Sequence, residues 1–185
     1  MDAAMLERAV KAAHAVVAGI SKDQLDDATP LTEWSVRDLL NHLIGEFDAV
    51  AAGAQGRKLD TSGEDYTADD HVTAYEAATA AANDALTAPG ALERTFTMPW
   101  GDNPGEMLIG LMIAETTVHG SDLARATGQE IAIDDDVAEA VYRSTTGMME
   151  PQGKFPRGTS FAPPVEVPDD APIRDKMLAY LGRRP

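Results

Sequence analysis

Residues 104–128 read PGEMLIGLMIAETTVHGSDLARATG, and this stretch indicates the fold more clearly than any other part of the chain. Apolar side chains recur in it at three- and four-residue spacings, which is typical of an amphipathic helix. Pro104 suits the first position of a helix, and Gly128 suits the position just after its end. The pattern therefore predicts a helix over 104–127. Its expected apolar side consists of Met107, Leu111, Ala114, Val118 and Leu123.

Glu115 and His119 stand four residues apart inside this predicted helix. That spacing places a carboxylate and an imidazole one turn apart on the same helix face. Two such groups can hold one metal ion. Taken alone, such a pair is more often just a hydrogen bond at the surface, so the motif needs a third group before it indicates a metal site.

Five further helices are expected from the same periodicity and from their end signals. Their ranges are 3–20, 35–52, 68–86, 134–149 and 172–181. In the second of these, Ser35 is the expected N-cap, with Asp38 three residues later as a capping-box partner. The apolar residues expected to face inward from that helix are Val36, Leu39, Leu40, Leu43, Ile44 and Phe47.

The remaining segments are expected to be irregular or short. A loop is predicted between Gly53 and Asp65, an extended segment over 94–100, and a turn over 101–105. Glu150 to Pro172 holds six of the eleven prolines and should be irregular. We therefore expect an all-α fold: a four-helix bundle with a proline-rich C-terminal segment and a short terminal helix, in one domain over 1–185.

The composition excludes several classes of function. A net charge of −16 disfavours nucleic acid and anionic membranes as partners, because phosphate groups would be repelled. The chain has no cysteine, so disulfides, thiolate ligands and a cysteine nucleophile are excluded, and any thiol must be a small molecule. With no long apolar run and no pattern of a signal peptide, a cytoplasmic location is expected.

His42, in the predicted helix 35–52, is the candidate for the third ligand. If its helix lies beside helix 104–127, its imidazole can join Glu115 and His119 in the interior of the bundle. Two histidines and one carboxylate leave coordination positions free for water or a substrate, as in catalytic rather than closed structural sites. The alternative is a helical bundle in which these three side chains have only structural roles.

Four other side chains are candidates for positions around this site. Glu46, one turn after His42, is interpreted as exposed or as an acceptor for an imidazole N–H before it is interpreted as a fourth ligand. Asp38 is a candidate for orienting His42, in addition to its capping role. Asp122 is a candidate for supporting the site by a hydrogen bond, and Trp100 either lines a pocket or packs in the core.

Three aromatic residues are given structural interpretations. His14 lies at the edge of an apolar stripe and is expected to be structural or partly exposed. His71 stands in the sequence Ala-Asp-Asp-His, where solvation is expected. Trp34 directly precedes Ser35 and is interpreted as a hydrophobic staple.

Two stretches resemble a known family. Thr32 to His42, TEWSVRDLLNH, resembles the opening motif of the mycothiol-dependent maleylpyruvate isomerase N-terminal domains, and Glu115 to Gly128 resembles their second signature. The end of the chain, from FAPPVEVPDDAP to LGRRP, is similar to an actinobacterial subgroup of metal-binding proteins in this family. The family is part of the wider DinB/YfiT-like superfamily, and the resemblance covers almost the whole chain.

The resemblance implies a four-helix bundle that holds a divalent metal, usually zinc with nickel as the alternative, on His42, Glu115 and His119. Characterised members use mycothiol or a similar thiol as cosubstrate in isomerase or transferase reactions, and a homodimer is a reasonable expectation for this superfamily. The chain departs from the isomerase by Ser121, where relatives often have tryptophan, and by the expected lack of a further C-terminal domain. Both departures concern the isomerase activity rather than the metal site.

Two functions from different classes follow. The first is a metal-dependent, thiol-using transferase or isomerase that acts with a small-molecule thiol or electrophile. The second is a metal-bearing binding or stress-accessory module without turnover.

Overall fold

A computed structural model of the chain describes residues 1–149 and 162–185. These residues form two compact units, Met1–Ile131 and Ala132–Pro185. The expected single domain over 1–185 therefore stays a prediction. No helix within the described ranges has the length and apolar composition that a membrane span requires.

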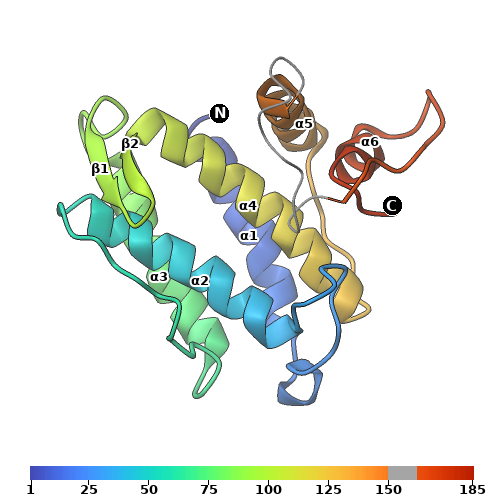
Figure 1. The fold of residues 1–185 in the computed structure, drawn as a ribbon, viewed down its shortest axis with the longest axis horizontal. Coiled ribbons are helices and arrows are strands. Elements are labelled where there is room, and N and C mark those ends of the chain that lie inside the picture. The colour runs from blue at the N-terminus through green and yellow to red at the C-terminus, as the bar shows by residue number, and fades with distance from the viewer. Residues whose placement is uncertain (150–161) are drawn as a thin grey trace. The chain divides into compact units, whose positions relative to one another are not determined.

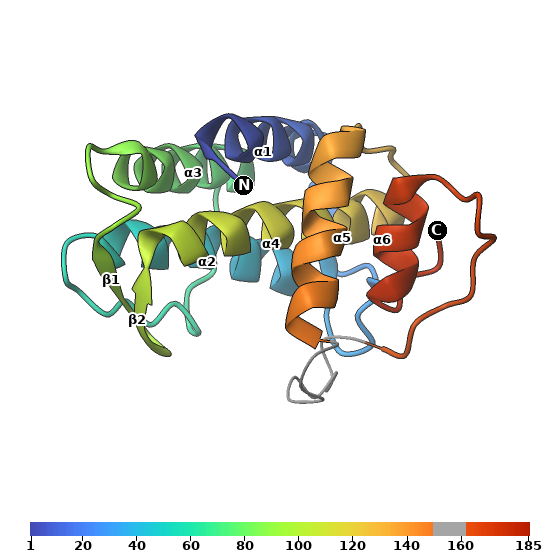
Figure 2. The same ribbon diagram turned by 90° about the horizontal axis from the view of Figure 1, so that it is seen from above.

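The first unit is organised around four helices. They are α1 (Ala3–Ala18), α2 (Val36–Gly53), α3 (His71–Thr87) and α4 (Gly105–Ala126), with a short 3₁₀ turn, η1 (Lys22–Gln24), after α1. α1 packs against α3 and α4, and α2 packs against the same two helices, so that the four enclose one core (Figures 1 and 2). The mostly helical character expected from the sequence is confirmed, and the four predicted helices differ from the observed ones only at their ends.

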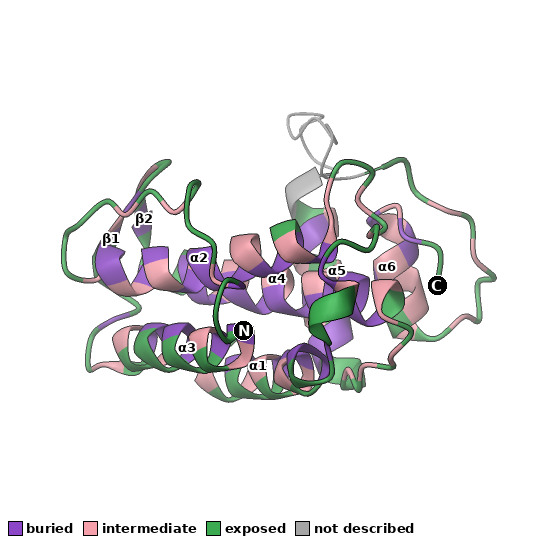
Figure 3. Cartoon of the chain, turned by 90° about the horizontal axis from the view of Figure 1, so that it is seen from below, coloured by how far each residue is buried: buried purple, intermediate pink, exposed green. Residues whose placement is uncertain are grey.

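The beginning of α2 follows the predicted capping box. The Ser35 hydroxyl oxygen accepts a hydrogen bond from the Asp38 backbone N–H at 3.2 Å, and the Asp38 carboxylate accepts one from the Ser35 N–H at 2.9 Å. The hydrogen bonds from Ser35 lower the pKa of Asp38 below its usual value. The six apolar side chains expected to face inward from α2 are all buried, and Figure 3 shows buried positions on the sides of α2 and α4 that face the other helices.

The apolar side of α4 was predicted correctly for Val118 and Leu123, which are buried, but not for the start of the helix. Met107 is half exposed, whereas the fully buried positions near the start of the helix are Leu108, Ile109, Met112 and Ile113. Because apolar residues occupy almost every position in this part of α4, the periodicity alone does not decide which ones face inward. The neighbours decide it, since α4 contacts α1 and α2 at once.

A β-hairpin precedes α4 and corrects one expectation. β1 (Thr95–Met98) pairs antiparallel with β2 (Gly101–Pro104), so the mostly helical fold includes one small hairpin, and residues 101–104 form a strand instead of the predicted turn. The turn lies two residues earlier, at 99–100, and the φ of +129° at Gly101 allows the chain to re-enter the ladder. Pro104 is then the N-cap of α4 and not its first residue.

The second unit contains α5 (Asp135–Met149) and α6 (Ile173–Tyr180), which pack against each other. Tyr142 of α5 and Tyr180 of α6 meet edge to face with ring centroids 5.7 Å apart. Both helices were expected. In the proline-rich segment, 162–172 contains no helix or strand, as predicted, and 150–161 lies outside the described residues.

Candidate metal centre

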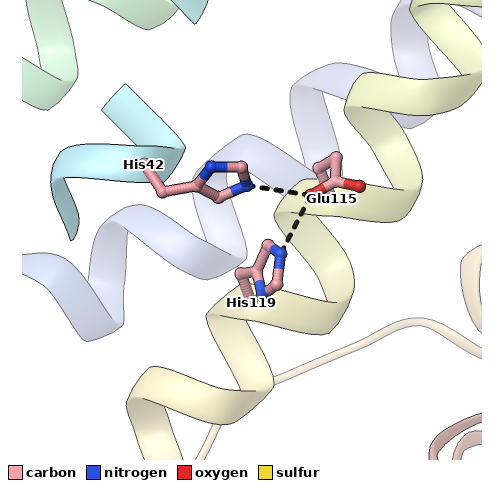
Figure 4. A group of neighbouring side chains, drawn as sticks. All are labelled: His42, Glu115 and His119. Atoms are coloured by element: carbon pink, nitrogen blue, oxygen red, sulfur yellow. Dashed lines mark hydrogen bonds and ion pairs between the residues drawn. The ribbon is translucent and has the colours of Figure 1, made fainter. Parts of the chain in front are cut away.

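The three predicted ligands come from two neighbouring helices of the first unit. His42 lies in the second turn of α2, while Glu115 and His119 lie in the middle of α4. Because α2 and α4 pack against each other, side chains on their facing sides can converge. Figure 4 shows the imidazole of His42 pointing from its helix toward the carboxylate of Glu115, with His119 one turn further along α4.

The ligand atoms of these side chains lie within 4.8 Å of one another. Glu115 Oε2 is 2.9 Å from Nε2 of His119 and 3.4 Å from Nε2 of His42. Ligand atoms bound at about 2.1 Å in tetrahedral geometry stand about 3.4 Å apart, so the donor set and its spacing suit a divalent ion. The structure therefore assembles the predicted group, and coordination of a metal by it stays a prediction.

His119 lies between two carboxylates. Its Nε2 faces Glu115, and its Nδ1 is 3.3 Å from Oδ2 of Asp122. Burial favours the neutral ring, but the hydrogen bonds to Asp122 and Glu115 outweigh this effect and raise the pKa of His119 to about 9. The two carboxylates thus favour the doubly protonated ring of His119 in the metal-free protein.

Glu115 is the counterpart of this charge. Burial alone would favour its neutral form, but the hydrogen bonds from His119 and His42 hold the pKa of Glu115 well below its usual value. The three side chains are partly shielded from water: 29% of His42, 24% of Glu115 and 13% of His119 is exposed. Each of the three side chains therefore keeps some contact with solvent, His42 the most and His119 the least.

Trp34 contacts both imidazoles, which sequence reasoning missed. Its ring centroid is 4.9 Å from that of His42, edge to face, and 6.5 Å from that of His119, nearly parallel. Helical periodicity does not predict this contact, because Trp34 precedes the N-cap of α2 and has no helical register with His42.

The other predicted neighbours of the site differ in how deeply they are buried and in whether they contact the three candidate ligands. Asp122 is buried, with 1% of its side chain exposed, and its Oδ2 lies 3.3 Å from Nδ1 of His119. Glu46 is half-buried, and burial raises its pKa. The nearby His42 lowers this pKa and the nearby Glu115 raises it, so Glu46 lies close to the group. It is not one of the three residues whose ligand atoms converge. Asp38 is exposed and bonded to Ser35, so the structure gives it the capping role.

Trp100 lies in the hairpin turn and is 50% exposed, which contradicts the alternative of core packing. Glu115 stands ten residues beyond the first residue of α4, which corresponds to about 15 Å along the helix axis from the hairpin. The structure thus does not bring Trp100 to the candidate metal centre. Pocket residues expected in 150–161 lie outside the described residues.

The two remaining histidines have structural surroundings. His71 was predicted to be solvated, but it is buried, and its Nε2 donates to the carbonyl of Val17 at 3.2 Å. The first turn of α3 packs against α1, which covers the ring despite the acidic residues before it. His14 is partly exposed, as expected, and its Nε2 is 2.8 Å from Oε1 of Glu76.

The first unit is thus a helical structure with a two-histidine, one-carboxylate group between two of its helices. The model of the mycothiol maleylpyruvate isomerase N-terminal domain matches residues 6–124, and the chain belongs to this family. The matched range includes the three candidate ligands and Asp122. The helical fold is consistent with the DinB/YfiT-like superfamily that the resemblance implied.

Curated relatives extend the similarity over nearly the whole chain. Two uncharacterised proteins of Mycobacterium tuberculosis, from strains H37Rv and CDC 1551, are each 35% identical over 177 residues. The alignments cover 96% of this chain and 94% of each relative, so they include both compact units. No solved structure matches the chain.

Proposed function

We propose that this protein binds a divalent metal, zinc or nickel, through His42, Glu115 and His119, in a DinB-like four-helix bundle. We propose further that it uses the site in a transferase or isomerase reaction that depends on a small thiol such as mycothiol. The observation that carries the proposal is the convergence of three ligand atoms from two helices within 4.8 Å.

The protonation of the group supports the proposal. Nε2 of His119 and Nε2 of His42 both face the Glu115 carboxylate in the metal-free state, and a metal ion would take the place of the protons they donate to it. The proton on Nδ1 of His119 can remain, because it is donated to the buried Asp122 carboxylate. That arrangement is the usual one for a metal-bound histidine, whose second nitrogen is held by a carboxylate or a carbonyl.

A bound divalent ion would supply a Lewis acid that lowers the pKa of a thiol or a water and favours its nucleophilic form. The protein's own residues hold the ring of His119 in one orientation and keep the carboxylate of Glu115 ionised. Burial raises the pKa of Glu46, which favours the protonated form of its carboxyl beside the site.

Two features of the chain support a small thiol as cosubstrate. The protein has no cysteine, so it cannot supply a thiol of its own. Its membership of a family described by mycothiol and maleylpyruvate isomerase points to such a cosubstrate. The group is also open to solvent on the side of His42, which a small molecule needs for access.

Metal analysis and thiol titration together test the proposal. The protein purified without chelators should contain close to one equivalent of zinc or nickel. After substitution by cobalt, addition of mycothiol should produce a sulfur-to-cobalt charge-transfer band, and the Glu115→Gln protein, loaded under the same conditions, should not produce it.

Each contrary outcome has a definite meaning. If the protein binds metal but the cobalt spectrum does not change when mycothiol is added, the enzyme hypothesis is wrong and the protein is a metal-bearing binding module. Absence of any bound metal after incubation with zinc, nickel or cobalt would leave a helical protein in which the three side chains form only a hydrogen-bonded cluster.

A further inference from the structure

The backbone of Trp34 is held in place on both sides of the residue. Its N–H donates to the carbonyl of Leu31 at 3.0 Å, and its carbonyl accepts hydrogen bonds from the N–H and the hydroxyl of Thr29. The next residue, Ser35, is the N-cap of α2. The indole therefore projects from a fixed point beside the helix that carries His42.

The indole touches two rings that stand at right angles to each other. The imidazoles of His42 and His119 have centroids 5.2 Å apart and an interplanar angle of 88°. Trp34 lies edge to face with His42, at 72°, and is inclined by only 20° to His119. One side chain is thus in contact with both histidines of the candidate metal centre.

The two histidines differ in what fixes their orientation. His119 has Glu115 on one nitrogen and Asp122 on the other. His42 has Glu115 on Nε2, and within the described part of the chain Nδ1 has no hydrogen-bond partner. A metal-bound imidazole normally needs a second contact to hold its plane, and for His42 the described ring contacts are those with His119 and, closer, with Trp34.

We propose that Trp34 is a positioning residue of this centre, whose indole holds the imidazole of His42 in the plane that directs Nε2 toward Glu115. The expected effect of Trp34 on metal affinity rests on the proposed metal site. The contact itself is a property of the metal-free protein and can be measured without an ion.

The first test is proton NMR of the metal-free protein, with the histidine C2–H signals assigned from single histidine variants. Trp34→Leu, which keeps an apolar side chain but removes the aromatic ring current, should move the signals of His42 and His119 and leave those of His14 and His71 in place. Trp100→Phe is the matched control and should move none of the four, because Trp100 is in the hairpin turn.

The second test is cobalt affinity, measured by competition with a chromophoric chelator. Loss of groups that orient metal ligands costs about 10- to 100-fold in affinity, so Trp34→Leu should bind cobalt about tenfold more weakly. Trp34→Phe, which restores an aromatic face, should recover most of that loss. Circular dichroism confirms that each variant keeps its helices.

The outcomes separate this inference from the proposed function. If His42 and His119 signals do not move in Trp34→Leu, or if Trp34→Leu binds cobalt as tightly as the unmodified protein, the positioning role is wrong. If the unmodified protein binds no metal, the proposed function fails, and the positioning role is then decided by the NOE between the His42 and His119 rings, which should be present in the unmodified protein and lost in Trp34→Leu.

Discussion

Nδ1 of His119 lies 3.3 Å from Oδ2 of Asp122, one turn further along α4, and Asp122 is almost fully buried. The contact fixes the plane of the imidazole so that Nε2 faces Glu115 at 2.9 Å. α4 therefore carries two candidate ligands, Glu115 and His119, and also Asp122, which orients His119. This relationship gives the first prediction.

Replacing Asp122 by Asn should weaken metal binding. The amide keeps the size of the side chain but removes the charge that stabilises the Nδ1 proton of His119, and such losses cost about 10- to 100-fold in affinity. Competition with a chromophoric chelator measures the change. Asp84→Asn, at an exposed position of α3, is the control and should bind metal normally. If Asp122→Asn binds metal with unchanged affinity, Asp122 does not support the metal site.

Replacing His119 by Ala should remove most of the bound metal and leave a folded protein. The variant loses one of the three candidate ligands. The core enclosed by helices α1 to α4 stays intact, because the buried apolar residues of that core are unchanged. Elemental analysis after dialysis measures the metal, and circular dichroism measures the helices. His14→Ala removes a histidine from outside the group and should keep full metal content. If His119→Ala also keeps full content, the ligand assignment is wrong.

Metal affinity should rise with pH up to about pH 9. Below the His119 pKa of about 9, a metal must displace the proton from Nε2, so the apparent affinity should increase by about tenfold per pH unit between pH 6.5 and 9. Cobalt titrations at several pH values measure the slope. A flat profile across this range would show that His119 is already neutral in the metal-free protein.

The metal-free protein should lose stability as pH rises from about 6.5 to about 9. His119 has a folded pKa raised above its usual 6.5, so its stabilising contribution is complete below 6.5 and is lost as pH passes through about 9. The lowered pKa of Glu115 acts in the opposite direction: its contribution is present above its usual 4.5 and is lost as pH falls. Thermal unfolding with a chelator present measures the first effect, and His119→Gln should flatten it. An equally steep loss in His119→Gln would assign the effect to other groups.

Gly120 should not tolerate a side chain. A Cβ at this position would lie 2.9 Å from Cδ1 of Ile131, the flexible end of a side chain that can turn aside, and 3.2 Å from Cβ of Ala13, so α1 would have to give by a few tenths of an ångström. Such overpacking costs about 1–3 kcal/mol of unfolding free energy, measured by urea denaturation of Gly120→Ala. Gly63→Ala, where a Cβ meets nothing within 4 Å, should be neutral or slightly stabilising. Equal stability of the two variants would contradict the close approach of these helices.

The helices and their caps could be predicted because they depend on residues close in sequence. The Ser35–Asp38 capping box and the i, i+4 spacing of Glu115 and His119 are consequences of helix geometry, and the structure contains both. The hairpin could not be predicted in the same way, since its second strand has the composition of a turn and forms only by pairing with Thr95–Met98.

The sequence by itself determined which side chains of α2 and α4 can reach one face of their own helix, because a helix repeats its geometry every turn. Only the tertiary structure decided that His42 meets Glu115, which is 73 residues away, that Trp34 packs on both imidazoles, and that His71 is buried against α1. These contacts depend on how the core packs the helices together. No local spacing in the chain encodes that arrangement.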